Sequence, residues 1–248
     1  MRGTRLVIVT WLWKNKNKHR VQAADFGVKH VNTLAGMLDR NIKQDFRFVC
    51  ITDDPDNPAF ECETFPLWDD HTELVSHPQS ETYVSCYPRL KIFSPEIGKA
   101  LEADVILSLD LDTVITGEFD SVLDSYEPPF TGLRVKENSR PLTYNGSMFM
   151  FDVGNPTVVK LWDEFDITTS PEQASLFGYR GSDQAWISFR LGNNYKWWGT
   201  DDGVYSYRKH VRQLHDLPSG CRIVHFFGRH NPWHADAASA RWIERYYK

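Results

Sequence analysis

The sequence predicts a single α/β domain in which helices flank a mixed, mostly parallel β-sheet. The chain has 248 residues, 41% of them hydrophobic and 25% charged, a globular composition that is large enough for one sizeable core. Apolar runs of strand length alternate with amphipathic segments of helix length. Two of the apolar runs end in acidic residues, and parallel strands of α/β proteins bind ligands at such carboxyl ends.

The N-terminal third predicts a strand, a helix and a strand. Residues 5–13, RLVIVTWLW, form an apolar, β-branched run, and residues 46–54, FRFVCITDD, form a second one. Between them, residues 19–41 carry apolar side chains three and four positions apart, which predicts one buried helical stripe. The members of that stripe are Val21, Ala24, Val28, Val31, Ala35 and Leu38. No glycine-rich dinucleotide motif or Walker lysine motif follows the first strand.

The remaining chain continues the alternation. Residues 87–103 predict one or two helices, and residues 104–115 and 144–154 predict strands. Two helices at residues 157–165 and 182–191, with Ser182 as the N-cap of the second, and a late strand at residues 221–228 complete the pattern. The prolines, glycine and charges of residues 128–141 predict a mobile loop.

Asp110 and Asp112 are the residues that point most directly to chemistry. They lie one residue apart in LSLDLDTVI, and in a continuous strand both carboxylates would face the same way and repel each other. A divalent cation between them removes that repulsion, and oxygen ligands suit Mg²⁺ or Mn²⁺. His225 ends a second apolar strand, and an imidazole shifts the preference toward Mn²⁺. Taken alone, a pair of aspartates is a weak signal, and so is one histidine among nine.

Composition disfavours several classes of partner. The net charge of -5 and the pI near 6.0 provide no general attraction for nucleic acid. No apolar run has the length of a membrane span, and the N-terminus lacks the pattern of a signal peptide. The four cysteines are scattered without metal-site spacing, so we expect free thiols in a reducing, cytoplasmic environment.

Five segments in order resemble the motifs of the GT-A glycosyltransferases, most closely glycosyltransferase family 8. They are RLK at residues 89–91, LSLDLDTVI at 107–115, YNGSMFMFD at 144–152, SDQAW at 182–186 and HFFGRHNPW at 225–233. The resemblance implies a single GT-A domain over residues 1–248, with a nucleotide-binding part (1–115) and a part for the sugar and acceptor (116–248). It also implies metal-dependent, retaining transfer from a nucleotide sugar, with UDP the expected nucleotide, to a carbohydrate or other hydroxyl acceptor.

The same resemblance implies roles for individual residues. Asp110, Asp112 and His225 would bind Mn²⁺ or Mg²⁺, with Asp110 also near the ribose. Asp183 and Gln184 would lie at the reacting centre. The remaining donor contacts would come from Thr10, Trp11, Arg89, Lys91, Asn145 and Gly228. The last motif departs from the family, which has lysine where this chain has Asn231, and asparagine cannot neutralise a phosphate. Arg229 or His230 in the same turn could replace that charge.

Other functions remain open at this level. A phosphatase of the haloacid dehalogenase type would use Asp110 as nucleophile and Asp112 as general acid, with residues 199–203, GTDDG, as its acidic motif. That family usually carries its nucleophile on the first strand, which argues against it. A relative that binds nucleotide or sugar without turnover is the second alternative, and transfer of sugar to modified DNA bases is a third. Trp197 and Trp198 are candidates for acceptor contact, and the basic run at residues 13–20 is a candidate for anion binding.

Overall fold

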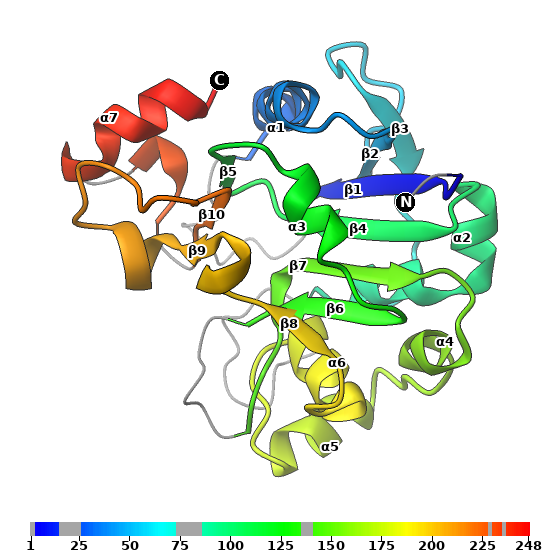
Figure 1. Cartoon of the computed structure of the whole chain (residues 1–248). Helices are drawn as coiled ribbons and strands as arrows, with labels where there is room; N and C mark the ends of the chain where they lie inside the picture. The colour runs from blue at the N-terminus through cyan, green and yellow to red at the C-terminus, as the bar shows by residue number, and fades with distance from the viewer. Residues whose placement is uncertain (1–2, 15–25, 73–85, 135–140, 228–229, 235–236) are drawn as a thin grey trace.

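The computed structural model describes residues 3–14, 26–72, 86–134, 141–227, 230–234 and 237–248. Over these residues a seven-stranded sheet has the order β3-β2-β1-β4-β7-β6-β8, and a three-stranded sheet has the order β5-β10-β9 (Figure 1). Helices flank the large sheet, as the sequence predicts. None of the helices in the described ranges is long and apolar enough to span a membrane.

The strands are β1 (Leu6–Leu12), β2 (Arg47–Thr52), β3 (Glu63–Pro66), β4 (Val105–Leu109), β5 (Thr113–Ile115), β6 (Phe130–Leu133), β7 (Asn145–Asp152), β8 (Lys196–Trp198), β9 (Val204–Ser206) and β10 (Ile223–His225). The α-helices are α1 (Val28–Asn41), α2 (Pro95–Ala100), α3 (Asp120–Asp124), α4 (Pro156–Asp163), α5 (Ser170–Leu176), α6 (Asp183–Leu191) and α7 (Ala237–Tyr246). Four short helical turns are η1 (Tyr87–Phe93), η2 (Thr200–Asp202), η3 (Tyr207–Val211) and η4 (Pro232–His234).

The parallel half of the large sheet is built on β1. This strand pairs in parallel with β2 on one side and β4 on the other, and β2 pairs in parallel with β3. Side chains of β1 are buried on both faces of the sheet, which explains why the strand is a continuous apolar run rather than an alternating one. The carboxyl ends of β1, β2 and β4 therefore meet at one edge.

The antiparallel half brings later residues to that same edge. Strand β7 runs antiparallel to β4, with Leu109 opposite Met148, so the start of β7 lies beside the end of β4. Strand β6 runs antiparallel to β7, and Leu133 at its end lies opposite Asn145. The carboxyl ends of β1, β4 and β6 and the beginning of β7 thus form one edge, which we call the site edge.

Two hydrophobic cores cover the two faces of the large sheet. One core contains Ile8 of β1 and Leu34 of α1 and continues into the second sheet through Val224 of β10. The other contains Val9 of β1, with Leu90 of η1 and further side chains of α2, α4 and α6. In Figure 1 the second sheet and α7 lie together at one side of the molecule, beyond the site edge.

The predicted strand-helix-strand unit at the N-terminus is confirmed by β1, α1 and β2. The described part of the predicted helix begins at Val28, and the segment 15–25, which contains most of the basic run, lies outside the described residues. Val31 and Leu38 are buried as predicted, whereas Ala35 is only partly buried, and Leu34 and Met37 complete the stripe.

The predicted strand at residues 104–115 and the predicted loop at residues 128–141 were both wrong. Residues 104–115 do not form one strand, because the chain leaves β4 after Leu109 and enters β5, in the second sheet, at Thr113. Asp110 and Asp112 therefore lie in the connection between two sheets, not side by side on one strand. The supposed loop 128–141 contains β6, whose four residues are fully buried, and residues 135–140 lie outside the described ranges.

The two helical glycines Gly36 and Gly98 provide a test of this packing. A Cβ at Gly98 would collide with Val153, which has stiff branched side-chain geometry, whereas at Gly36 the nearest atom is the end of the Arg40 side chain at 3.1 Å. We expect Gly98→Ala to lower the free energy of unfolding by about 1–3 kcal/mol through overpacking. We expect Gly36→Ala to raise it by about 0.5–1 kcal/mol through helix propensity. Urea unfolding of both variants measures this, and equal effects would contradict the predicted packing of α2.

Candidate active site

The guanidinium of Arg89 is the centre of the site edge. Its Nη1 lies 3.0 Å from Oδ1 of Asp110, and its Nε lies 3.4 Å from Oδ2 of Asp183. Its Nη2 donates a hydrogen bond of 2.6 Å to the carbonyl of Gly146 at the start of β7. One buried cation therefore ties together three segments that follow β4, begin β7 and begin α6.

The sequence places Arg89 there through the short helical turn η1. Pro88 near the first position starts the turn, and Leu90 packs into the core below the sheet. The guanidinium lies over the ring of Trp11, 5.4 Å from its centroid. Burial alone would lower the pKa of Arg89, but the charges of Asp110 and Asp183 outweigh it and raise the pKa.

Asp183 and Gln184 begin α6 directly beside this cation. Burial raises the pKa of Asp183 more than Arg89 lowers it, with a further rise from Asp110. Nε of Arg89 and Oδ2 of Asp183 form an ion pair at 3.4 Å, but neither atom makes a hydrogen bond. Gln184 Oε1 accepts from the N–H of Gly146 at 3.5 Å. The Asp183 carboxylate therefore retains the capacity to accept a hydrogen bond from a ligand.

Ser182 occupies the N-cap position of α6 as predicted, but its side chain makes no capping hydrogen bond. Its hydroxyl lies 3.2 Å from Oδ1 of Asp183 and accepts from the N–H of Cys86 at 3.1 Å, so it joins α6 to the segment before η1. The Ser182 hydroxyl therefore orients the Asp183 carboxylate instead of accepting from a backbone N–H at the start of α6.

Asp112 and His225 lie at the junction of the two sheets. His225 of β10 pairs with Thr113 of β5, and the N–H of Phe226 donates to the carbonyl of Asp112 at 2.9 Å. Thr113 Oγ1 lies 3.0 Å from Nδ1 of His225, which orients the ring. Antiparallel pairing of β5 with β10 thus brings residues more than a hundred positions apart to adjacent backbone positions.

Individual atoms of these residues fit a divalent cation. The buried Nε2 of His225 has no hydrogen-bond partner, and burial lowers the pKa of this histidine to about 3, so the ring is neutral. With its proton on Nδ1, facing Thr113, the imidazole presents a bare Nε2 of the kind that binds metals. Burial and the neighbouring Asp110 raise the pKa of Asp112 well above its usual range, a cost that a cation would remove.

The side chains are not gathered into a finished metal site. Across the described ranges, no three histidine, cysteine, aspartate or glutamate side chains are placed to hold one ion. Asp110 instead faces Arg89, and 28% of its side chain is exposed. The predicted ligand set of Asp110, Asp112 and His225 therefore stays a prediction, and it requires the Asp110 carboxylate to turn toward Asp112.

Other predicted donor residues differ in how open they are. The Thr10 side chain is fully buried and donates to the carbonyl of Leu109 at 2.9 Å, and Trp11 Nε1 donates to Ser108 at 2.9 Å. Nζ of Lys91 lies 2.6 Å from the Asp70 carboxylate and 5.8 Å from the centroid of the Trp162 ring. Lys91 therefore does not share the ion pairs of Arg89 with Asp110 and Asp183.

The remaining predicted donor positions and the two tryptophans predicted to contact the acceptor differ in their burial. Asn145 is partly buried and its Oδ1 accepts from the N–H of Ser147, while Asn231 is buried next to η4. Gly228 and Arg229 lie outside the described residues. Trp198 is fully buried and donates to Ser125, which makes it a core residue rather than an acceptor contact, whereas Trp197 is partly buried.

Two residues of the site were missed at the sequence level. Gly146 offers its carbonyl to Arg89, and a Cβ there would lie 3.4 Å from the Asp183 carboxylate, so only a small residue leaves this approach open. Cys86 lies close enough to Asp183 that burial and this carboxylate raise the pKa of its thiol to about 12. The Asn145-Gly146 pair in the sequence could have indicated Gly146, whereas no sequence pattern indicated Cys86.

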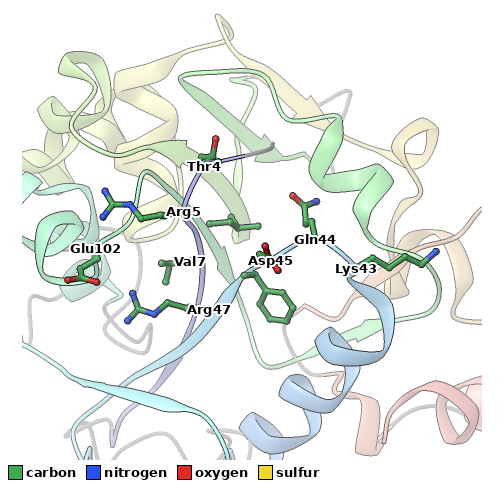
Figure 2. A pocket seen from close by; sticks show the side chains of 11 residues that line it. Thr4, Arg5, Val7, Lys43, Gln44, Asp45, Arg47 and Glu102 are labelled. Atoms are coloured by element: carbon green, nitrogen blue, oxygen red, sulfur yellow. The ribbon is translucent and has the colours of Figure 1, made fainter.

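The described cavities lie elsewhere. One of about 660 Å³ is lined by Arg5, Lys43, Arg47 and Glu102 (Figure 2), around the amino ends of β1 and β2. A second of about 460 Å³ includes Val105, at the amino end of β4. Both are at the opposite edge of the sheet from Arg89, where parallel α/β sheets do not usually bind their ligands.

Known structures share this arrangement over nearly the whole chain. The galactosyltransferase LgtC, in complex with donor and acceptor sugar analogues, superposes with a TM-score of 0.58 over 98% of this chain and 96% of its own, at 13% identity. An active-site mutant of LgtC gives 0.59 over 96% and 93%, also at 13% identity. The fold is that of the GT-A glycosyltransferases.

A further GT-A match is longer than this chain. The glycosyltransferase GlyE of Streptococcus pneumoniae TIGR4 superposes with a TM-score of 0.58 at 13% identity, over 96% of this chain but 59% of its own. No protein-family model and no curated protein matches the sequence. At these identities the superpositions establish the GT-A fold, and the chemistry has to be argued from the residues at the site edge.

Arg89 should be essential for the stability of this site. Replacing it in Arg89→Met leaves the buried Asp183 and the partly exposed Asp110 without their counter-charge, and we expect a loss of about 3 kcal/mol in the free energy of unfolding. The matched control is Arg5→Met, which breaks the exposed pair with Asp104. That variant should change stability little, because solvent screens exposed pairs. Urea unfolding of both proteins in a metal chelator measures the difference, and an Arg89 variant as stable as the control would contradict this account.

His225 should make the metal-free protein sensitive to acid. Its pKa is about 3 in the folded protein and near its ordinary 6.5 when unfolded, so the unfolded chain binds the extra proton between these values. Stability should therefore fall as the pH drops below about 6.5, by up to about 1.4 kcal/mol per pH unit from this residue. His225→Asn should flatten this slope, whereas the exposed His215→Asn should not. Identical slopes for all three proteins, measured by unfolding from pH 7 to 4.5, would refute the buried neutral histidine.

Proposed function

We propose that this protein is a metal-dependent glycosyltransferase that moves a sugar from a UDP-sugar to a hydroxyl acceptor. The observation that carries the proposal is the buried Arg89, paired with Asp110 and Asp183 at the site edge of a GT-A fold. Such charges are costly to bury and are common where a protein binds a polar substrate. The resemblance of its motifs to family 8 adds UDP, Mn²⁺ or Mg²⁺ and retention of configuration.

In this proposal Asp110, Asp112 and His225 hold the cation. The cation supplies Lewis-acid stabilisation of the charge that develops on the departing nucleoside diphosphate. Asp110 would exchange Arg89 for the metal, a change that the partial exposure of its side chain permits. The guanidinium would keep its contacts with Gly146 and Asp183, and its Nη1, released from Asp110, could then donate to the negatively charged donor.

Asp183 and Arg89 suit the sugar itself. A sugar hydroxyl both donates and accepts hydrogen bonds, so one hydroxyl can accept from Nε of Arg89 and donate to Oδ2 of Asp183. These are the two buried atoms of the ion pair that make no hydrogen bond in the protein alone. Transfer also builds positive, oxocarbenium-like character on the sugar ring, and in this proposal the Asp183 carboxylate would stabilise it. Gln184 would orient the same region through its contact with Gly146.

The alternatives are less compatible with this geometry. In the phosphatase reading, the acidic motif at residues 199–203 would serve magnesium, but Asp202 accepts from the N–H of Gly199 and lies near Lys196. The non-catalytic reading remains distinct, because it predicts nucleotide binding without release of the donor sugar.

Calorimetric titration tests the donor site. We expect UDP to bind in the presence of Mn²⁺, more tightly than GDP, and we expect Asp112→Asn to lower the affinity for UDP at least tenfold because a metal ligand is lost. The matched control Asp201→Asn removes an exposed carboxylate from the other acidic motif and should bind like the wild type. No Mn²⁺-dependent binding of either nucleotide would refute the proposal.

Turnover separates an enzyme from a binding protein. With a panel of UDP-hexoses and Mn²⁺, we expect UDP release from at least one donor and a loss of about a hundredfold or more in Asp183→Asn, as for removal of a charge-stabilising group. Binding of UDP with no donor turnover would favour the non-catalytic alternative. Hydrolysis of a generic phosphomonoester would favour the phosphatase.

A further inference from the structure

The C-terminal end of the chain brings a tyrosine to the junction of the two sheets. Tyr247 follows α7, and its backbone N–H donates to the carbonyl of Ile243 at 2.7 Å, so it continues the last helical turn. Helix α7 packs against β5, the strand that begins directly after Asp112. The hydroxyl oxygen of Tyr247 is buried and has no hydrogen-bond partner among the residues that the structure describes.

An aromatic cluster holds the tyrosine ring in place. The rings of Trp233 and Tyr247 lie 6.0 Å apart, and Trp233 in turn lies 4.0 Å from the ring of His30 in α1. Nε1 of Trp233 is also buried without a partner. Two donors, one from η4 and one from the chain terminus, are therefore left unsatisfied in adjacent rings. Buried donors are seldom left unpaired, and water, an ion or a ligand completes those that the protein does not.

Asp112 lies within electrostatic reach of this hydroxyl. An ordinary phenol is protonated at neutral pH and can donate a hydrogen bond, and burial, with the charge of Asp112, only raises the pKa of Tyr247 further. No hydrogen bond between Tyr247 and Asp112 is present in the described structure. Among the described residues, His225 Nε2 is a further buried atom without a partner, as are Oγ of Ser206, which pairs with His225, and Nε1 of Trp242 in α7; Nε2 presents a lone pair for a cation. The junction thus combines acceptors for a cation with donors for an anion.

We propose that Tyr247 is a donor-binding residue whose hydroxyl donates a hydrogen bond to a phosphate oxygen of the nucleoside diphosphate. This inference rests on the proposed function, because it places the diphosphate beside a cation held at Asp112. It also offers a partial answer to Asn231, which stands where the resembled family has a phosphate-binding lysine. A protonated phenol restores one of the hydrogen bonds that the lysine would make, although not its charge.

The test is UDP binding by Tyr247→Phe, which removes only the hydroxyl. In the presence of Mn²⁺ we expect the affinity for UDP to fall about tenfold, as for a hydrogen bond to a charged group. The affinity for Mn²⁺ alone should stay unchanged, because the phenol is not a metal ligand here. The matched control is Tyr246→Phe, the adjacent partly buried tyrosine whose ring faces the Arg245 guanidinium at 5.1 Å, and it should bind UDP like the wild type.

Stability provides the second readout. If the Tyr247 hydroxyl serves a ligand, its removal should leave the unfolding midpoint of the ligand-free protein unchanged or slightly raised, because an unsatisfied buried donor is lost. A lowered midpoint together with unchanged UDP affinity would show a purely structural role and overturn the inference. Wild-type and Tyr247→Phe proteins that bind UDP equally would overturn it while leaving the proposed function intact. Failure of the wild type to bind UDP would overturn both.

Discussion

A buried guanidinium between two carboxylates organises one edge of this protein. Arg89 contacts Asp110, Asp183 and the carbonyl of Gly146, so the end of β4, the start of β7 and the start of α6 are held by one side chain. Burying the charges of Arg89 and Asp183 is unfavourable unless they compensate each other, and the 3.4 Å contact between Nε and Oδ2, without a hydrogen bond, leaves this compensation incomplete. A polar ligand could complete these hydrogen bonds, because Nε of Arg89 can donate to it and Oδ2 of Asp183 can accept from it.

The topology explains why that edge gathers residues from the whole chain. Parallel pairing of β1 with β4 brings the first strand to it, and the antiparallel β7 returns the chain to the same edge. The departure of β5 into a second sheet then carries the chain past Asp112 to β10 and His225. Because the chain leaves β4 before it enters β5, the Asp110 side chain can contact Arg89 while the backbone carbonyl of Asp112 accepts from Phe226, which directly follows β10.

Sequence reasoning recovered the elements whose signal is local. The apolar runs of β1, β2 and β7 and the amphipathic stripe of α1 are visible as periodicity, and the fold class follows from their alternation. The split of residues 104–115 was not recoverable in this way, because apolar residues recur at Leu109, Leu111 and Val114 across the break. Only the pairing of residues 113–115 with β10 assigns them to a second sheet. Likewise β6 is a strand because Phe130 and Thr131 pair with β7, although its turn-forming flanks predicted a loop.

The site was predicted as residues but not as contacts. Motif order indicated Arg89, Asp110 and Asp183, and the structure brings these three together, whereas Lys91 turns to Asp70 and the Thr10 side chain is buried in the sheet. The proposed metal site requires Asp110, Asp112 and His225 to bind one divalent ion that anchors a nucleoside diphosphate. Crystals grown with UDP and Mn²⁺, measured at the manganese absorption edge, test it most directly. We expect one anomalous peak at roughly 2.0–2.3 Å from all three side chains, with the diphosphate attached. A peak elsewhere, or nucleotide bound with Asp110 still paired to Arg89 and no metal beside it, would contradict it.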